Sequence, residues 1–346
     1  MPLRFGINGL GRIGRALLRI VLTREDLPPG LEPAAVNDIV PAPLLARLLA
    51  RDSVHGPFSL PVRAETDALI VGAPGEERRI PVFHEPDPAR IPWREAGVES
   101  VVEATGRFLK RGQAAAHLRD GVRTVLLSAN SDPAEPADIA LCRGIAEAWD
   151  PERHPVASNA SCTTNALALV AKVLHDRFGV RRALMSTVHS YTESQRLLDL
   201  PHPDPRRSRA AALNIIPTAT TAAHGAGLLL PELAGRIEGF AVRVPTPAVA
   251  MLDLVADLER KTTIEEIRNA YRDTAAGDLA GLLGVAEDEP VSSDFVGDPR
   301  SAVVDLPLIQ TSGSLARVVA WYDNEWGYSN RLAELLARLS RGGSDA

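Results

Sequence analysis

Cys162 is the residue whose type and position best suit it to act as a nucleophile. It lies within residues 158–165, SNASCTTN, directly before a stretch whose apolar residues repeat with helical periodicity. The dipole and free amides at a helix N-terminus stabilise a thiolate, so this position would lower the thiol pKa. The hydroxyl groups of Ser161, Thr163 and Thr164 can cap the helix and bind an anion. A buried structural cysteine beside a helix cap is the alternative interpretation.

His189 is the candidate base for this thiol. It follows an apolar strand predicted at residues 183–188, and the imidazole group titrates close to neutral pH. A lone histidine is more often structural, so the hypothesis depends on its combination with Cys162 and with a nucleotide-binding loop elsewhere in the chain. A cysteine hydrolase could use the same pair but would have no use for that loop.

The nucleotide-binding motif is GLGRIG at residues 9–14, which follows a short apolar strand and opens an amphipathic helix. Gly9 and Gly11 would let the backbone turn and approach a pyrophosphate, and Gly14 would let the helix pack closely against the strand. A second strand ends before Asp38, whose carboxylate would bind ribose hydroxyls and repel a 2′-phosphate. The pattern predicts NAD as the cofactor in preference to NADP. A glycine-rich turn that binds no nucleotide and a non-catalytic NAD sensor are the alternatives.

Two regions of the chain, which differ in their predicted order of strands and helices, must position these residues. Strands and helices alternate over the first 130 residues or so, which predicts a mostly parallel sheet covered on both faces. The pattern changes at about residue 156. A helix is predicted after Cys162, and longer strands come after that helix. We expect these strands to be antiparallel, at residues 183–189, 239–244, 250–258, 301–306 and 315–322. A final helix is predicted from residue 330 to about residue 339.

Composition excludes several classes of protein. The 346 residues suffice for about two domains, and 45% hydrophobic and 24% charged residues are ordinary for a soluble globular chain. The two cysteines, Cys142 and Cys162, cannot build a disulfide framework or a four-thiolate metal site, so no metal is expected. The net charge of −6 and the scattered arginines offer no basic stripe for nucleic acid.

The chain shows no targeting or membrane-spanning pattern. It begins directly with a strand-like pattern, without the basic and apolar regions of a secretion signal. No apolar run approaches the roughly 18 residues that a membrane-spanning helix needs. We therefore expect a cytoplasmic protein with no membrane partner.

Several segments together resemble the phosphorylating glyceraldehyde-3-phosphate dehydrogenase family (type I) over nearly the whole chain. The matching segments are GINGLGRIGR at 6–15, DSVHG at 52–56, ATGRF at 104–108, ASCTTN at 160–165, RVPTP at 243–247 and WYDNEWGYSN at 321–330. The resemblance implies an α/β Rossmann-type nucleotide-binding domain at residues 1–160, completed by a C-terminal helix at 326–346. It also implies an α+β catalytic domain with a mostly antiparallel sheet at 161–325.

The resemblance further implies NAD-dependent oxidative phosphorylation of D-glyceraldehyde 3-phosphate to 1,3-bisphosphoglycerate. The Cys162 thiolate would attack the aldehyde, loss of a hydride would leave a thioester, and inorganic phosphate would release the acyl phosphate. His189 would activate the thiol, act as the base and bind the oxyanion.

Other site residues follow from the same resemblance. Ser161, Thr163 and Thr220 match the inorganic-phosphate site, and Thr192, Arg207 and Arg243 match the substrate-phosphate site. Asn324 and Tyr328 match nicotinamide contacts, and Arg12, Ile13, Asp38 and Ser128 match adenosine and pyrophosphate contacts. Leu200 and Pro201 resemble a loop that crosses to a neighbouring subunit, which implies a homotetramer. Without the resemblance, Arg207 would be interpreted as part of a solvated loop.

The chain departs from the family pattern at a few positions. Thr221 stands where the family has a glycine that offers its amide to inorganic phosphate, and its β-branched side chain would alter that site. His224 replaces a common lysine, and Pro86 stands where an arginine presents its carbonyl near the adenine. Residues 202–207, HPDPRR, are also similar to erythrose-4-phosphate dehydrogenases, which hydrolyse the thioester with water. That activity is the alternative function.

Overall fold

The computed structural model describes residues 2–27 and 30–340, which divide into two compact units. The first unit is formed by residues 1–141, 147–160 and 329–346, and the second by residues 142–146 and 161–328. The helix expected at 326–346 is α7 (Trp326–Ser340), and residues 341–346 of that prediction lie outside the described residues. No helix in the described parts of the chain is both long enough and apolar enough to cross a membrane.

The first unit is built on a sheet whose strands lie, across the described residues, in the order β10-β11-β9-β8-β1-β2-β7-β6-β5. Its central strands pair in parallel, as predicted, whereas β5, β6 and β7 pair antiparallel at one edge and were not predicted. The strands are β1 (Leu3–Asn8), β2 (Leu31–Asn37), β5 (Val62–Glu65), β6 (Ala68–Val71), β7 (Arg78–Phe83), β8 (Ser100–Glu103), β9 (Thr124–Leu127), β10 (Ile139–Ala140) and β11 (Val156–Ser158), with a separate pair β3 (Arg51–Asp52) and β4 (Gly56–Pro57).

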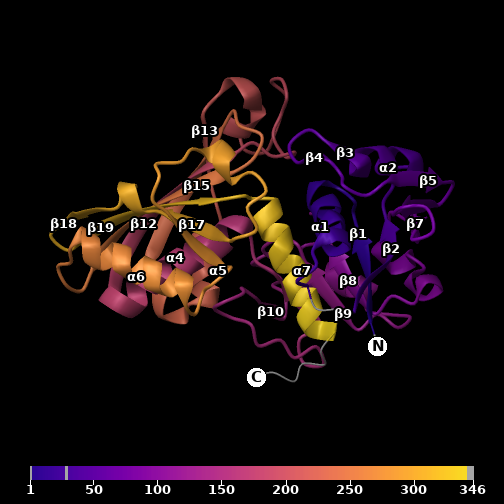
Figure 1. Cartoon of the computed structure of the whole chain (residues 1–346), viewed down its shortest axis with the longest axis horizontal. Coiled ribbons are helices and arrows are strands. Elements are labelled where there is room, and N and C mark those ends of the chain that lie inside the picture. The colour runs from indigo at the N-terminus through magenta and orange to yellow at the C-terminus, as the bar shows by residue number, and fades with distance from the viewer. Residues whose placement is uncertain (1, 28–29, 341–346) are drawn as a thin grey trace. The chain divides into compact units, whose positions relative to one another are not determined.

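Helices cover this parallel sheet, so its central strands are buried along almost their whole length. The helices are α1 (Arg12–Thr23), α2 (Ala42–Ala50) and α3 (Arg111–Ala114). Helices α1 and α7 lie side by side (Figure 1), and Arg24 at the end of α1 donates hydrogen bonds to Asn330 (2.8 Å) and Glu334 (2.7 Å) of α7. These contacts fix the C-terminal helix to the rest of the first unit.

A buried polar network joins the carboxyl ends of β1 and β8. The carboxylate of Glu103 accepts hydrogen bonds from Asn8 Nδ2 (2.6 Å) and from the backbone amide of Thr105 (2.8 Å). His117 Nε2 lies 3.2 Å from the same carboxylate, and Trp93 Nε1 donates to His117 Nδ1 at 3.1 Å. Because an indole can only donate, His117 carries its proton on Nε2 and donates it to Glu103. The network holds Asn8, the residue before Gly9, in a fixed position.

The second unit is built on a sheet in the order β13-β14-β12-β15-β19-β17-β16, with β18 paired to β19, over the part of the chain that is described. The mostly antiparallel sheet is confirmed, but the β12–β14 and β16–β17 pairs are parallel, which corrects the expectation for those strands. The strands are β12 (Val180–Ser190), β13 (Ile216–Thr218), β14 (Ile237–Val244), β15 (Ala250–Leu258), β16 (Leu283–Ala286), β17 (Ala302–Asp305), β18 (Gln310–Ser312) and β19 (Leu315–Tyr322).

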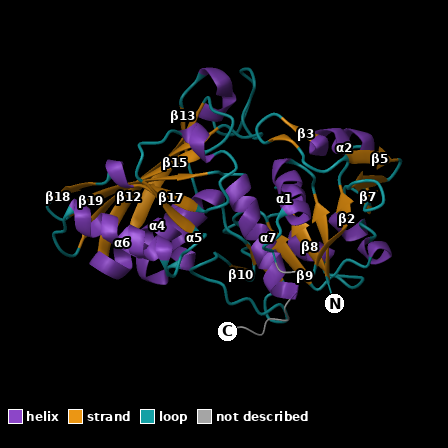
Figure 2. Cartoon of the chain, in the orientation of Figure 1, coloured by secondary structure: helices purple, strands orange, loops and turns teal. Residues whose placement is uncertain are grey.

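Helices α4 (Cys162–Phe178), α5 (Ala222–Leu229) and α6 (Ile264–Ala276) lie on one side of the second sheet (Figure 2). α4 contacts β12, β15 and β19 and also packs against α5 and α6, so most of its side chains are buried. The hydroxyl of Tyr271 on α6 donates to the carbonyl of Val170 on α4 at 2.9 Å. The helix that begins at Cys162 is thus held by the sheet and by its two neighbouring helices.

Candidate active site

Cys162 is the first residue of α4, and the residues before it shape the turn into the helix. Ala160 has φ +52°, a left-handed conformation that is uncommon for alanine. Ser161 then caps the helix, since its Oγ accepts a hydrogen bond from Thr164 N at 3.1 Å. The helix N-terminus expected at this cysteine is therefore confirmed, together with its serine cap.

His189 approaches the thiol from the sheet. Its Nε2 lies 3.7 Å from Cys162 Sγ, and its side chain stands near the end of β12. The imidazole is almost entirely buried, with 4% of the residue exposed. The two residues that the sequence singled out as nucleophile and base are thus brought into contact, although neither lies near the other in the chain.

The electrostatic setting of this pair differs from the one expected from the sequence. Burial raises the pKa of the Cys162 thiol above its usual value, while the positive charge of Arg243 and hydrogen bonds from Thr163 act in the opposite direction. Burial, and secondarily the charge of Arg243, lowers the pKa of His189 to about 3. Burial is the largest influence on the pKa of both groups, and it favours the uncharged thiol and the neutral imidazole.

Arg243 is the third member of this group. It lies opposite His189 in the parallel register of β12 and β14, so both side chains leave the sheet on the same face. Its Nη1 lies 2.7 Å from His189 Nδ1 and donates to the carbonyl of Ser190 at 3.1 Å. Arg243 was expected at the substrate phosphate, and the structure shows that it also contacts the candidate base.

Two further residues support the site and were not predicted for it. The Tyr322 hydroxyl lies 2.8 Å from Thr163 Oγ1 and 2.8 Å from Thr187 Oγ1, and it therefore bridges α4 and β12. Ser190 Oγ donates to Asn324 Oδ1 at 3.1 Å. Tyr322 lies within the segment WYDNEWGYSN, so its presence near the site was foreseeable, but its contacts depend on the strand register.

Arg207 and Thr192, the other two residues expected at the substrate phosphate, bond to neighbours in the structure. Arg207 Nε donates to Thr218 Oγ1 at 2.8 Å, and Thr218 Oγ1 donates to Asp204 Oδ2 at 2.8 Å. The Thr192 hydroxyl lies 3.1 Å from Ser194 Oγ. Neither residue contacts Cys162 or His189 directly among the described residues, although the charge of Arg207 adds to burial, the main cause, in lowering the pKa of Arg243.

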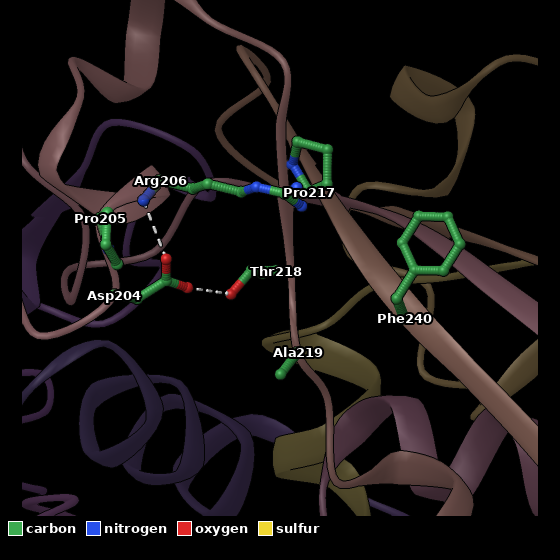
Figure 3. Close-up of a pocket in the computed structure, with 7 residues that line it drawn as sticks. All are labelled: Asp204, Pro205, Arg206, Pro217, Thr218, Ala219 and Phe240. Carbon is green, nitrogen blue, oxygen red and sulfur yellow. Dashed lines mark hydrogen bonds between the residues drawn. The ribbon is translucent and has the colours of Figure 1, made fainter.

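A pocket of about 650 Å³ lies next to this loop (Figure 3). Asp204 lies at its wall, where its carboxylate accepts from Thr218 and from the backbone amide of Arg206 at 2.9 Å. The other lining residues are Pro205, Pro217, Ala219 and Phe240. The candidate nucleophile and base are not among the residues that line it, so this pocket is separate from the reactive pair.

The residues expected at inorganic phosphate lie at two helix N-termini. Ser161 and Thr163 begin α4, whereas Thr220 and Thr221 precede α5, and Thr220 Oγ1 accepts from Ala222 N at 3.2 Å. Thr221 has φ −93° and ψ 6°, a conformation open to any residue. The backbone therefore accommodates a threonine at this position, where the resemblance implied a glycine.

The glycine loop after β1 has the form that a dinucleotide requires. Gly9 has φ +94°, and a Cβ on Gly14 would lie 2.2 Å from the carbonyl oxygen of Gly9. A Cβ on Gly11 would meet nothing within 4 Å, so the backbone there is open. No side chain caps the N-terminus of α1, which leaves its first amides directed at the loop. The loop fits a pyrophosphate.

Asp38 follows β2 beside this loop, and its Oδ2 accepts a hydrogen bond from Leu10 N at 2.8 Å. A carboxylate oxygen has further lone pairs, so Asp38 can also accept from ribose hydroxyls.

Arg12 in the first turn of α1 donates a hydrogen bond to Asp52 at 2.7 Å. Burial alone would raise the pKa of Asp52, but the backbone amides of His55 and Val54, together with Arg12, lower it to about 2. The Asp52 carboxylate therefore stays charged beside the start of α1.

The other residues expected at the cofactor lie at several places in the chain. Ile13 lies in the first turn of α1 and is half-buried, Ser128 follows β9, and Pro86 is exposed after β7. Asn324 and Tyr328 are both buried; Asn324 lies in the turn between β19 and α7, and Tyr328 lies in the first turn of α7. The described residues contain no group of three histidine, cysteine or acidic side chains that could hold a metal ion.

Comparison with known proteins gives matches over both units. Residues 3–111 match the family model for the glyceraldehyde 3-phosphate dehydrogenase NAD binding domain, and residues 161–324 match the model for the C-terminal domain of the same enzyme. The chain is 48% identical over 345 residues to glyceraldehyde-3-phosphate dehydrogenase 1 of Bacillus subtilis (strain 168), which covers 99% of this chain and 100% of the relative. It is 48% identical over 345 residues to the glyceraldehyde-3-phosphate dehydrogenase of Geobacillus stearothermophilus, with the same coverage, and 48% identical over 338 residues to that of Kitasatospora aureofaciens, covering 97% and 99% of the two chains.

Proposed function

Because the chain belongs to the glyceraldehyde-3-phosphate dehydrogenase family, we propose that Cys162 is its nucleophile and His189 its base. The activity is the NAD-dependent oxidation of glyceraldehyde 3-phosphate. The observation that supports the two residue assignments is the 3.7 Å contact between Cys162 Sγ and His189 Nε2 at the N-terminus of α4. Erythrose-4-phosphate dehydrogenase activity is not favoured, because relatives that match this chain over their whole length are named for the glyceraldehyde enzyme.

In the first step His189 accepts the proton of the Cys162 thiol, and the sulfur attacks the aldehyde carbon. The resulting oxyanion would be held by the backbone amide of Cys162 and by the imidazolium Nε2–H. NAD, held at the loop of Gly9–Gly14, supplies the hydride acceptor when bound. The imidazolium would pass its proton to this oxyanion, and the neutral His189 would then take the same hydroxyl proton back as the hydride leaves, so a thioester remains on Cys162 beside an imidazolium.

Two anion sites complete the proposed reaction. Ser161, Thr163, Thr220 and Thr221 would hold inorganic phosphate for attack on the thioester, which releases 1,3-bisphosphoglycerate and restores the thiol. Thr192, Arg207 and Arg243 would hold the phosphate of the substrate. An arginine guanidinium offers paired, charge-assisted hydrogen bonds to phosphate oxygens, which suits both arginines to this role.

The cofactor assignments follow the loop geometry. The residues that would hold NAD are Gly9, Gly11, Arg12, Ile13, Gly14, Asp38, Pro86, Ser128, Asn324 and Tyr328. The open backbone at Gly11 and the uncapped start of α1 favour pyrophosphate there, and the Asp38 carboxylate favours a free 2′-hydroxyl over a 2′-phosphate.

We also propose the domain roles and the setting of the enzyme. Residues 1–160 with 326–346 would form the NAD-binding domain, and residues 161–325 the catalytic domain. Exposed apolar side chains cluster in the loop around Leu200, at Leu197, Leu198, Leu213 and Ile215, which supports assembly into a homotetramer. We propose a cytoplasmic location, with no nucleic acid or membrane as partner, because two cysteines are too few for the disulfide framework of a secreted protein.

The test is NADH formation on mixing the protein with NAD and glyceraldehyde 3-phosphate. Without phosphate we expect a burst of about one NADH per subunit and no further turnover, because the thioester persists. Phosphate should restore turnover, and equal turnover with and without phosphate would contradict the phosphorylating reaction. Cys162→Ser should abolish the burst. Cys142→Ser is the matched control, since Cys142 is buried against Asn165 (3.3 Å), and it should keep the burst.

A further inference from the structure

The carboxylate of Glu103, at the carboxyl end of β8, is the centre of the buried polar network between β1 and β8. One of its oxygens accepts hydrogen bonds from Asn8 Nδ2 at 2.6 Å and from His117 Nε2 at 3.2 Å. The other oxygen accepts from the backbone amide of Thr105 at 2.8 Å and from the Thr105 hydroxyl. Glu103 is 1% exposed, so these hydrogen bonds are shielded from water. Among the described residues, this carboxylate is surrounded by donors alone.

The direction of these hydrogen bonds is fixed by groups that have only one possible role. Trp93 Nε1 can only donate to His117 Nδ1, so the neutral imidazole must present its Nε2–H to Glu103. The Thr105 hydroxyl accepts from the backbone amide of Arg107 at 3.1 Å, and its own proton points to Glu103. Both groups therefore require an acceptor at residue 103.

The network continues from Glu103 through two asparagines. The Asn37 side-chain oxygen accepts from the backbone amide of Glu85 at 2.9 Å, so its nitrogen donates to Asn8 Oδ1 at 2.8 Å. The same nitrogen donates to the Glu85 carbonyl at 2.9 Å. Asn8 must then turn its own nitrogen towards Glu103. Backbone groups thus set both amide orientations, and only an ionised carboxylate at residue 103 satisfies every donor around it.

Three members of this network each directly precede, in the chain, a residue expected at the cofactor. The pairs are Asn8 and Gly9, Asn37 and Asp38, and Glu85 and Pro86. They lie at or just after the carboxyl ends of β1, β2 and β7, which are neighbours in the sheet (Figure 1). Thr105 also borders the glycine loop, since a Cβ on Gly9 would lie 2.9 Å from Thr105 Cγ2. One network therefore reaches each of these segments at the strand ends, where open α/β sheets bind their ligands.

We propose that Glu103 is a positioning residue for the cofactor: its carboxylate aligns the ends of β1, β2 and β7 so that they bind the adenosine and pyrophosphate of NAD together. Glu103 acts through Asn8 and Thr105 and does not itself touch the cofactor, because protein donors already enclose its carboxylate. This inference rests on the proposed cofactor residues. It adds to them a buried residue on which the affinity for the nucleotide depends.

Glutamine at this position would disturb the alignment, because an amide cannot match donors on both of its ends. The glutamine side chain has nearly the size of glutamate, but one end is an NH2 group. That group would face either Asn8 Nδ2 and His117 Nε2 or the Thr105 amide, all of which are donors. The free protein can relieve this conflict by moving Asn8 and the loop, whereas a bound nucleotide requires the original arrangement. The conflict therefore lowers the affinity for the nucleotide.

Calorimetric titration of the full-length protein with ADP-ribose tests the proposal, since this probe carries the adenosine and pyrophosphate of NAD but no nicotinamide. We expect Glu103→Gln to weaken binding of ADP-ribose about tenfold, the change expected when a buried hydrogen bond is lost. The affinity for NAD should fall by the same factor. In steady-state assays the KM for NAD should rise, while the KM for glyceraldehyde 3-phosphate stays the same. A folded Glu103→Gln protein with unchanged affinity for ADP-ribose would overturn the proposal.

Thr124→Val is the matched control for a loss of stability alone. Thr124 Oγ1 donates to Ser100 Oγ at 2.8 Å, and both residues are buried. The variant removes a buried hydrogen bond at the opposite end of β8 from Glu103. It should lower the urea unfolding midpoint and keep the affinity for ADP-ribose. If this variant bound ADP-ribose as weakly as Glu103→Gln, affinity would follow stability and the positioning role would be refuted.

Two variants of His117 test the same network with Glu103 intact, and they apply even if Glu103→Gln does not fold. His117 is completely buried, and among the described residues its side chain hydrogen-bonds to Trp93 and Glu103 alone. His117→Leu removes the donor to Glu103 and should weaken ADP-ribose binding. His117→Gln keeps an N–H donor and should bind ADP-ribose more tightly than the leucine variant.

Equal affinities of the two His117 variants for ADP-ribose would contradict a role that depends on the hydrogen bond to Glu103. A wild-type protein that binds no ADP-ribose would overturn the proposed cofactor site and this inference together. Normal binding by the wild-type protein and by Glu103→Gln would overturn the inference alone. These titrations need no turnover, so they are separate from the NADH burst of Cys162, which tests the proposed function.

Discussion

The hydroxyl groups of Tyr322 and Thr163 lie 2.8 Å apart, and this contact ties the first turn of α4 to strand β19. The same phenol oxygen lies 2.8 Å from Thr187 Oγ1 on β12, the strand that ends at the candidate base. Tyr322 is 2% exposed, so these hydrogen bonds are shielded from water. The distance between Cys162 and His189 therefore depends on a residue that hydrogen-bonds to neither of them.

Tyr322→Phe should loosen the contact between the nucleophile and the base. Loss of the hydroxyl leaves two buried threonine hydroxyls without this partner, which we expect to lower the free energy of unfolding by about 1–3 kcal/mol. The NADH burst should also become slower, because Cys162 moves with Thr163. Urea unfolding and stopped-flow absorbance measure the two effects.

Tyr271→Phe provides the matched control for this variant. Tyr271 is also buried, and its hydroxyl donates to Val170 in the middle of α4 rather than at its start. This variant should lose a similar amount of stability and keep the burst rate. A slower burst in both variants would show that stability, not the local contact, sets the rate.

The free energy of unfolding should depend on pH, in a direction set by the pKa shifts of His189 and Cys162. The pKa of His189 falls from 6.5 to about 3 on folding, so between these values the unfolded chain binds one proton more than the folded chain. Stability therefore rises with pH across this range, by at most about 1.4 kcal/mol per pH unit from this group. The Cys162 pKa is raised above 9.0, so above that pH the unfolded chain loses a proton first and stability falls.

Urea unfolding midpoints measured from acid to alkaline pH check this expectation. His189→Asn should reduce the slope below pH 6.5, and Cys162→Ser should reduce the fall above pH 9.0. An unchanged acid slope in His189→Asn would show that His189 is protonated in the folded protein.

The strands and helices that could be predicted are those that the sequence of a single chain segment determines. β15 and β19 occupy residues 250–258 and 315–322, as predicted; buried and less buried side chains alternate along β15, and β19 carries a run of apolar residues bounded by turns. The parallel pairing of β12 with β14 could not be foreseen, because periodicity identifies a strand but not its partner. The short edge strands β5 and β6 were missed because four residues give too little periodic signal.

The same limit applies to the candidate site. Cys162 and His189 were predicted from residue type and from their places at a helix start and a strand end. The contact of Arg243 with His189 depends on the β12–β14 register, and the Tyr322 bridge depends on packing of α4 against β19. Desolvation of the thiol is likewise a property of the packed structure, and for this reason the helix N-terminus alone gave the wrong direction for its pKa.

Thr221→Gly should strengthen binding of inorganic phosphate without changing the fold. Thr221 adopts φ −93° and ψ 6°, which glycine can also adopt, so we expect a stability change of only a few tenths of a kcal/mol at this helix start. Removing the β-branched side chain opens the amide to a closer approach of the phosphate, which should lower the KM for phosphate and leave the KM for glyceraldehyde 3-phosphate unchanged. Steady-state titrations of each substrate separate the two constants.

Thr221→Ala shows which property of the side chain matters. If bulk beyond Cβ restricts the phosphate, alanine should behave like glycine. A higher KM for phosphate in both variants would instead show that the threonine hydroxyl binds the anion.

Substitution by alanine should change the free energy of unfolding differently at Gly11 and at Gly14. A Cβ at Gly14 would meet the loop backbone, whereas a Cβ at Gly11 would meet no neighbouring protein atom. In Gly14→Ala the new Cβ would lie 2.2 Å from the Gly9 carbonyl oxygen, so the loop must shift, at a cost of about 1–3 kcal/mol or more. In Gly11→Ala the new Cβ meets no protein atom within 4 Å, so the unfolding free energy should change by less than about 0.5 kcal/mol.

Binding of NAD should nevertheless be weakened in both variants. Gly14→Ala would displace the loop itself, whereas Gly11→Ala would place a methyl group where the pyrophosphate approaches an intact loop. Titration of each variant with NAD by calorimetry, together with urea unfolding, separates these causes. A Gly11→Ala protein that is stable and binds NAD normally would show that the pyrophosphate does not pass this backbone, and the Gly9–Gly14 loop would then have to hold the cofactor through the amides of α1 alone.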